Sequence, residues 1–364
     1  MSLPVDQRGE GAGPGAHHSR EAAGHGSVGN WEERFMRERR SMALMIALAL
    51  IVSAMAARGG EGPTLLSPLP EGDGIAAKYP GDEGIAGDPA VVFGDGFETA
   101  QAGALANGFH RESNMKWDDT WGGCLIVEGG ENVHGGHKAL QMTIKRPGSE
   151  PGGAGMQKYL EEGFDTLFLR YYAKFEKNIE VYHGGAHNGA AIDARAPGVP
   201  QGCPGVRATG ANKFDVCLDT WRPQQEIASP GHLVLYVYHM NQGNRWGDQF
   251  FPSGRVIPPD RALFGEGFAP RPDLIPDRDR WYCYELMLQA NTPGKRDGRT
   301  AFWVDGKLVG DFPNLRFRNV ATLKPNHFGL GFYTNNRRVR NDVTMWFDDV
   351  VAATSYIGPQ TGRP

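Results

Sequence analysis

Two tyrosines lie two positions apart in GHLVLYVYHMNQGNRWG, the stretch from Gly231 to Gly247. Its first half alternates like a β-strand, in which side chains point to opposite faces with a period of two, so Tyr236 and Tyr238 share a face. The strand then runs into polar side chains that can bind a ligand: His239, Asn241 and Arg245. We therefore treat the tyrosines as candidate proton-transfer groups. Sheet packing is the alternative, because tyrosine is common in strands.

A second set of polar residues lies in RYYAKFEKNIEVYHGGAHNGA, which begins at Arg170. Alternation places Arg170, Tyr172 and Lys174 on one strand face. The glycine-rich turn that follows carries His183, His187 and Asn188. Each has an ordinary alternative. Arg170 can pair with an acid on the sheet, loop histidines are often surface residues, and asparagines often cap turns.

These side chains suit β-elimination on a uronic-acid polysaccharide. The reaction removes the weakly acidic proton at C5 and expels the sugar at O4, so the neighbouring carboxylate must be neutralised. Two phenols, or a phenol and an imidazole, can supply the base and the acid. A nearby cation lowers the pKa of a phenol that acts as base. We predict that Tyr236 and Tyr238 share the acid and base roles and that His187 or His183 helps to neutralise the carboxylate. The predicted substrate-binding residues are Arg170, Lys174, Asn188, His239, Asn241 and Arg245.

Signatures of several other enzyme classes are missing from the sequence. It contains no G-x-S-x-G, H-E-x-x-H, Walker loop or Rossmann glycine fingerprint. It also lacks the E-x-D-x-E strand of jelly-roll hydrolases. The adjacent Asp348 and Asp349 would point to opposite strand faces, which is wrong for an acid and a base across one glycosidic bond. This weakens a glycoside hydrolase and leaves a non-catalytic carbohydrate-binding module or lectin as the main alternative.

Short apolar or alternating runs separated by turn residues dominate the chain from Ala90 on. Together with 51 Gly and 25 Pro in 364 residues, they favour many short strands over helices. We predict an all-β fold, an antiparallel β-sandwich or jelly roll over residues 90–358. Asp305-Gly306 is a hairpin signal. Gly184 to Pro230 and Asn241 to Asp279 show little strand character, and we predict two long loops that wall a groove beside the tyrosines.

The order of several segments resembles polysaccharide lyase family 14. These segments are YYAKF…VYHGGAHNG, LYVYHMN, RWYCYELMLQANTPGKRDGRTAFWVDGKLV, HFGLGFYTNN and WFDDVV, spread over roughly residues 90–357. The resemblance implies a concanavalin-like β-jelly roll with alginate or glucuronan lyase activity, and catalytic roles for Tyr236 and Tyr238. The family's lysine in a G-G-K turn is replaced here by Ala186. Either His183 or His187 takes its role, or the protein binds its polysaccharide without cleaving it.

The first 57 residues are predicted to lie outside the folded domain. Residues 1–35 show no hydrophobic period and read as a disordered or non-native leader. Residues 36–57 combine a basic start, an apolar run and the A-x-A-like site Ala54-Met55-Ala56, the pattern of a signal peptide. We expect a secreted protein that begins near Ala57, with an uncleaved anchor as the alternative. Residues 58–89 are predicted to be a linker or extended arm.

Export would place the four cysteines in an oxidising compartment. We predict the pairs Cys203–Cys217 and Cys124–Cys283, with four separate buried thiols as the alternative. The sequence has no C-x-x-C, so we do not expect a zinc site. The acidic sets Asp95–Glu98 and Asp348–Asp349 are candidates for a structural calcium ion, although turn acids explain them better.

The expected partner is an anionic polysaccharide. The formal net charge of −4 gives no bias toward nucleic acid or a membrane surface. We predict no catalytic cofactor or metal, and we assume a monomer because the sequence is silent on oligomeric state. Two tryptophans in alternating runs, Trp303 and Trp346, are predicted to be core. Three others are candidate stacking platforms for sugar rings: Trp117, Trp121 and Trp246.

Overall fold

The computed structural model describes residues 67–105, 116–149, 152–181, 184–200, 204–258, 263–265, 267–334 and 339–362. They belong to one compact unit, Pro63–Pro364. The predicted leader, signal peptide and cleavage site, together with His183 and Cys203, lie outside the described residues. None of the helices described could serve as a transmembrane span, being too short or too polar.

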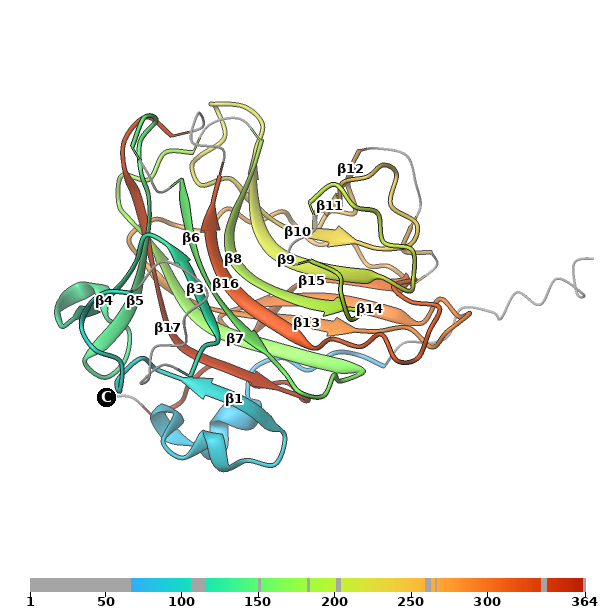
Figure 1. Cartoon of the computed structure of the whole chain (residues 1–364), viewed down its shortest axis with the longest axis horizontal. Coiled ribbons are helices and arrows are strands. Elements are labelled where there is room, and N and C mark those ends of the chain that lie inside the picture. Colours follow the sequence, from blue (N-terminus) through green and yellow to red (C-terminus); the bar gives the residue numbers. More distant parts are fainter. Residues whose placement is uncertain are drawn as a thin grey trace, which may run out of the picture. The chain divides into compact units, whose positions relative to one another are not determined.

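Two antiparallel sheets make up the fold, as predicted (Figure 1). We call the larger one sheet A. Its strand order is β15 (Lys307–Leu315), β14 (Gly298–Val304), β13 (Trp281–Gln289), β7 (Thr166–Phe175), β17 (Val343–Ala353), β5 (Lys138–Ile144), β4 (Cys124–Glu128) and β2 (Gly103–Ala104), with β1 (Val91–Asp95) also paired to β17.

Sheet B has eight strands and carries the tyrosine strand, β10. Its order is β12 (Val256–Ile257), β11 (Asp248–Phe250), β10 (His232–Tyr238), β9 (Lys213–Arg222), β8 (Gly184–Arg195), β16 (His327–Tyr333), β6 (Gly153–Tyr159) and β3 (Asp119–Gly122). Strands β8, β9 and β16 bend strongly along their length (Figure 1).

The core fills the space between the sheets with every second side chain of each strand. In β10 these are Leu233, Leu235 and Val237, which leaves Tyr236 and Tyr238 on the outer face of sheet B. Asp305 and Gly306 both have positive φ, and they form the predicted hairpin turn between β14 and β15.

The outer face of sheet A is covered by chain from both ends of the described unit. The amino-terminal part holds three short 3-10 helices: η1 (Ile75–Lys78), η2 (Pro80–Asp82) and η3 (Ile85–Gly87). Ile75 N–H donates to Tyr356 O (3.2 Å), and both side chains join an apolar cluster with Trp303. The segment predicted as a linker or extended arm is therefore packed against sheet A from Ser67 on.

The prediction of two long structureless loops was wrong. Gly184 to Pro230 contains β8 and β9, the strands next to β10, and Asn241 to Asp279 contains the short β11 and β12. Small residues hide the alternation of β8, and residues 187–190 bulge opposite only two residues of β9. The outer face of β9 carries the charged residues Lys213, Asp215 and Asp219, so the strand lacks the apolar texture on which the prediction relied.

The predicted disulfides are not formed, because Cys124, Cys217 and Cys283 are free thiols. Cys124 lies on β4 and Cys283 on β13, with β7, β17 and β5 between them in sheet A. Four strand spacings of about 4.8 Å put them roughly 19 Å apart, far beyond the reach of a disulfide.

The acidic sets considered for calcium accept hydrogen bonds within the fold. Asp95 accepts from Phe97 N–H (3.0 Å) and from Trp117 Nε1–H (2.9 Å). Asp348 accepts from the main-chain N–H of His134 (2.9 Å) and of the next residue (3.0 Å). These contacts fit turn acids, and a calcium ion here stays a prediction. Trp303 and Trp346 are buried as predicted, but Trp117 is also buried and cannot stack on a sugar.

Candidate functional site

The outer face of sheet B brings together two rows of side chains that run across the strands. One row follows the register Tyr236, Cys217, Ala191, Gly329 and Gln157. The neighbouring row carries an ionisable side chain on each of its five strands: Tyr238, Asp215, Asp193, His327 and Tyr159. A cavity of about 110 Å³ opens over the middle of this face, where glycine and alanine keep its floor low. We call this face the groove.

The two tyrosines form a hydrogen-bonded pair at one side of the groove. The Tyr236 hydroxyl donates to the Tyr238 oxygen (3.1 Å), which also accepts from Gly205 N–H (3.2 Å). Gly247 N–H donates to the Tyr236 oxygen (3.0 Å). Burial, and next the bond to Tyr238, raise the pKa of Tyr236 well above its usual value. Tyr236 is partly exposed, whereas Tyr238 is only 3% exposed. Tyr236 is therefore the phenol that can meet a ligand directly.

A buried lysine, Lys213 on β9, lies against the second tyrosine. Its Nζ is 3.6 Å from the centre of the Tyr238 ring and 3.1 Å from Asp215 Oδ2. A cation on the face of a phenol stabilises negative charge on that ring. Lys213 thus lies on the face of the Tyr238 ring, while Gly205 N–H and the Tyr236 hydroxyl donate to the oxygen of the same phenol.

Two carboxyl groups, Asp193 and Asp215, sit directly opposite each other on β8 and β9. Burial raises the pKa of Asp215 to about 7, Lys213 opposes that rise, and Asp193 adds to it. Burial also acts to raise the pKa of Asp193, but His327, Arg195 and Lys213 together hold it below its usual value. Carboxyl groups whose pKa values are pushed apart in this way are a frequent feature of catalytic sites.

His187 on the β8 bulge lies beside the tyrosine pair. Its ring centre is 5.5 Å from that of Tyr236 and 6.1 Å from that of Tyr333, and its side chain is 47% exposed. Its Nδ1 is 2.7 Å from Asp219 Oδ2. The thiol of Cys217 is close by, and burial and then the negative charges of three aspartates raise its pKa well above the usual value.

Four large aromatic side chains of the described residues are exposed, and three of them stand on the outer face of sheet B: Trp121, Tyr159 and Tyr333. The fourth, Trp246, lies in the loop after β10, where its ring stacks under Arg245 (5.0 Å). Exposed aromatic rings on both sides of the groove are suited to packing against sugar rings.

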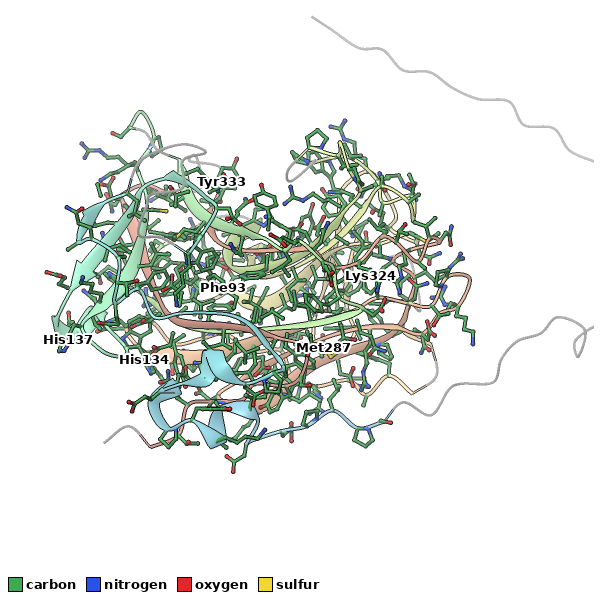
Figure 2. The ribbon with its side chains drawn as sticks, turned by 60° about the horizontal axis from the view of Figure 1, so that its bottom comes forward. Phe93, His134, His137, Met287, Lys324 and Tyr333 are labelled. Carbon is green, nitrogen blue, oxygen red and sulfur yellow. The ribbon has the colours of Figure 1, made fainter. Side chains whose placement is uncertain are left out.

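Arg170 and Lys174 are not part of this site, which corrects the prediction. They share a face of β7 with Tyr172, as the alternation required, but that face is the outer side of sheet A. Arg170 is fully buried and paired with Asp82. Lys174 Nζ donates to a main-chain oxygen of η4 (Gly130–Asn132), at 2.7 Å. His134, which stacks on Tyr172, and Tyr333 of the groove lie far apart in Figure 2.

The other predicted binding residues are spread around the groove. His239 is fully buried, with Nε2 2.9 Å from Asp248 Oδ2, so it cannot contact a substrate in this structure. Asn188 is buried and donates to Thr220 Oγ1 (2.6 Å). Asn241 contacts Arg296. Arg245 is exposed and lies near Gly205, whose N–H donates to Tyr238. Of the predicted set, the structure thus brings together Tyr236, Tyr238, His187 and Arg245.

The residues that sequence reasoning missed come mainly from β9 and β16. They are Lys213, Asp215, Cys217, Asp219, Asp193, His327 and Tyr333. The segment KFDVCLD carried a usable signal, because polar residues at every second position indicate a strand with one chemically active face. His327 had no local signal, since the register between β16 and β8 alone brings it to Asp193.

No protein-family model matches the chain, and no curated protein matches it in sequence. Several solved structures resemble it in fold. A mutant of the alginate lyase Aly36B, in complex with alginate trisaccharide, has 17% identity and a TM-score of 0.51 over 74% of this chain and 99% of that chain. The marine PL-14 alginate lyase from Aplysia kurodai has 17% identity and a TM-score of 0.49 over 72% and 99%. The endo-β-1,4-glucuronan lyase from the fungus Trichoderma reesei has 16% identity and a TM-score of 0.43 over 73% and 96%. The likeness to the Aly36B structure shows the lyase-like β-jelly roll that the sequence predicts.

Proposed function

We propose that this protein is a polysaccharide lyase that cleaves a uronic-acid-containing polysaccharide by β-elimination. The observation that carries the proposal is the hydrogen-bonded pair Tyr236–Tyr238, with Lys213 against the second ring, on the open face of the jelly roll. The similar Aly36B structure is an alginate lyase bound to an alginate trisaccharide, which supports an anionic uronate polymer as the substrate class.

The different exposure of the two phenols supports different roles. Tyr236 contacts the sugar, while Tyr238 acts behind it as a proton store. When the C5–H bond breaks, its proton passes to the Tyr236 oxygen as the Tyr236 proton moves to the Tyr238 oxygen, a step for which Tyr238 must start as the phenolate. The electron pair of the C–H bond forms the C4=C5 double bond, and the C4–O4 bond breaks. The reverse proton movement then delivers a proton from Tyr236 to the leaving O4.

Substrate binding draws on the rest of the groove. The rings of Trp121, Tyr159 and Tyr333 offer apolar surface to sugar faces. Arg245 and His187 are exposed cationic or ionisable groups beside the tyrosine pair, and we assign them to the uronate carboxylate.

A polymer of this kind is met outside the cell, and this agrees with the predicted signal peptide. Sequencing the amino terminus of secreted material should give a start near Ala57, and a retained Met1 or Met36 would contradict it.

A carbohydrate-binding protein without catalysis is the second candidate. Two observations favour it. Tyr238 is nearly inaccessible, and Ala186 stands where the resembling family has a lysine. Under this reading the aromatic rings hold the polysaccharide, and the tyrosine pair only shapes the wall of the groove.

Product absorbance separates the two candidates. Purified protein is incubated with alginate, glucuronan, heparin-like and pectic polymers, and the ultraviolet absorbance of the unsaturated product is followed. The lyase proposal predicts rising absorbance with at least one uronate polymer and none with a neutral glucan. Tyr236→Phe should abolish most of this rate while it retains binding. Binding of a uronate polymer with no absorbance change at any pH from 5 to 10 would support the binding protein instead.

A further inference from the structure

Three side chains of different chemistry converge on the floor of the groove: His187, Cys217 and Asp219. Their nitrogen, sulfur and oxygen ligand atoms all lie within 4.8 Å of one another. Cys217 and Asp219 are two residues apart on β9 and therefore point to the same side of the strand, and His187 reaches them from the bulge of β8.

We propose that His187, Cys217 and Asp219 bind a divalent transition-metal ion of the zinc class. Thiolate and imidazole are ligands that zinc and its neighbours prefer, whereas calcium and magnesium take oxygen ligands. Three protein ligands with an open fourth position are typical of zinc sites that also bind a substrate or water. All three residues line the 110 Å³ cavity, so the open position faces the groove.

The geometry requires only a small closure. Bonds of about 2.0–2.3 Å in a tetrahedral site place ligand atoms roughly 3.5 Å apart. The largest separation, at most 4.8 Å, therefore has to shrink by no more than about 1.3 Å. His187 is the ligand that can move, because it is half exposed and sits on the bulge of β8. The other two ligands lie on β9, which is paired with a strand on each edge and is therefore held in place.

The charges of the groove favour a cation at this point. Asp219 is buried and lies against His187, so its charge offsets any positive charge that the imidazole carries. The next outward-facing position along β9 from Cys217 is Asp215, with Asp193 opposite it. Lys213 and Arg195 already lie beside Asp215 and Asp193, so Asp219 is the carboxylate whose charge a metal ion would offset before an anionic polymer binds here. A metal ion bound by Asp219 would supply that charge about 2 Å from a carboxylate that would otherwise repel the substrate.

The ion would also explain why the site lies next to the tyrosine pair. The His187 ring is 5.5 Å from that of Tyr236, so a carboxylate on the open metal position would hold the adjacent C5 near the phenol. This role in neutralising the carboxylate rests on the proposed function. Binding of the metal itself does not.

Cobalt is a direct probe, because a thiolate bound to Co²⁺ gives a charge-transfer band in the near ultraviolet. The full chain, reduced and stripped with chelator, is titrated with CoCl₂ and then with ZnCl₂. We expect one equivalent to produce the thiolate band and zinc to displace it. Cys217→Ser should abolish the band, and His187→Gln, a change at a half-exposed position, should weaken zinc affinity by about tenfold or more. Cys283→Ser, which removes a buried thiol of sheet A, is the matched control and should keep the band.

Absence of a band in folded wild-type protein, or a band that persists in Cys217→Ser, would overturn the metal site. The lyase assay separates the two proposals. A stoichiometric Cys217-dependent band without lyase activity leaves the metal site standing and contradicts the proposed function. Full lyase activity in chelator-treated protein, unchanged when zinc is added, would support the lyase and contradict the role of the metal in neutralising the carboxylate.

Discussion

Replacing Tyr238 by phenylalanine removes one oxygen and leaves the packing of the ring unchanged. That oxygen accepts hydrogen bonds from the Tyr236 hydroxyl (3.1 Å) and from Gly205 N–H (3.2 Å). Each bond contributes about 0.5–1.5 kcal/mol net, so the free energy of unfolding should fall by about 1–3 kcal/mol. The ring keeps its contact with Lys213, so the fold itself should be unchanged.

The effect on the reaction should be much larger than the effect on stability. Without the Tyr238 oxygen, the proton of Tyr236 has no acceptor when the C5 proton arrives. We expect kcat to fall by about 10²–10⁴-fold, the usual contribution of a positioned acid or base. Because Tyr238 is buried and does not contact the sugar in this account, KM should change little.

The assay is the initial rate of product absorbance on the best uronate polymer, alongside unfolding in urea. Tyr282→Phe is the matched control. The Tyr282 hydroxyl donates to Asp277 Oδ2 (3.0 Å) and accepts from Asp277 N–H (3.1 Å), but it lies on β13 of sheet A. It should lose similar stability and keep its rate. A Tyr238→Phe protein that is folded and turns over at the wild-type rate would refute the relay.

Three further variants test other parts of the account. Arg170→Met should lower the free energy of unfolding by about 3–5 kcal/mol, because it leaves Asp82 without its buried partner. The kcat of the folded variant should be unchanged, and a selective loss of kcat would show that Arg170 belongs to the site. Burial raises the pKa of Glu285 to about 7, so the folded chain keeps a proton that the unfolded chain releases, and stability should fall as pH rises from about 4 to 7. Urea unfolding of Glu285→Gln should show a flatter pH profile over that range, and an identical slope would argue against the raised pKa. Trp121→Ala should raise KM up to about tenfold with kcat nearly unchanged, and an unaltered KM would remove Trp121 from the substrate path.

The sequence predicted the strands whose apolar alternation is plain, and with them the jelly roll. It also predicted the shared face of Tyr236 and Tyr238, which depends only on the two-residue period of a strand. It could not place Arg170 relative to them. Alternation says which residues share a face but not whether that face looks into the groove or onto the other side of the sandwich. That choice is made by the amino- and carboxy-terminal segments that cover sheet A.

The parts of the site that were missed depend on contacts between distant segments. Lys213 reaches the Tyr238 ring because β9 pairs with β10, and His327 reaches Asp193 because β16 pairs with β8. Charged residues such as Asp215 and Asp219 made β9 look like loop, since burial of a polar strand face is a tertiary property. The predicted pair Cys124–Cys283 failed for a related reason, because spacing along the chain does not reveal strand order.

The chemical structure of the newly formed chain ends tests most directly whether the polymer is cleaved by β-elimination. Wild-type protein is incubated with the uronate polymer in water enriched in heavy oxygen, and the new chain ends are measured by mass spectrometry, with Tyr236→Phe run in parallel. Elimination breaks the C4–O4 bond without adding water. We therefore expect each cut by the wild type to leave one unsaturated end, which is lighter by one water than a hydrolytic end and contains no heavy oxygen. Tyr236→Phe should form neither unsaturated nor hydrolytic ends. Incorporation of heavy oxygen into saturated ends, or unsaturated ends formed equally well by Tyr236→Phe, would contradict this expectation.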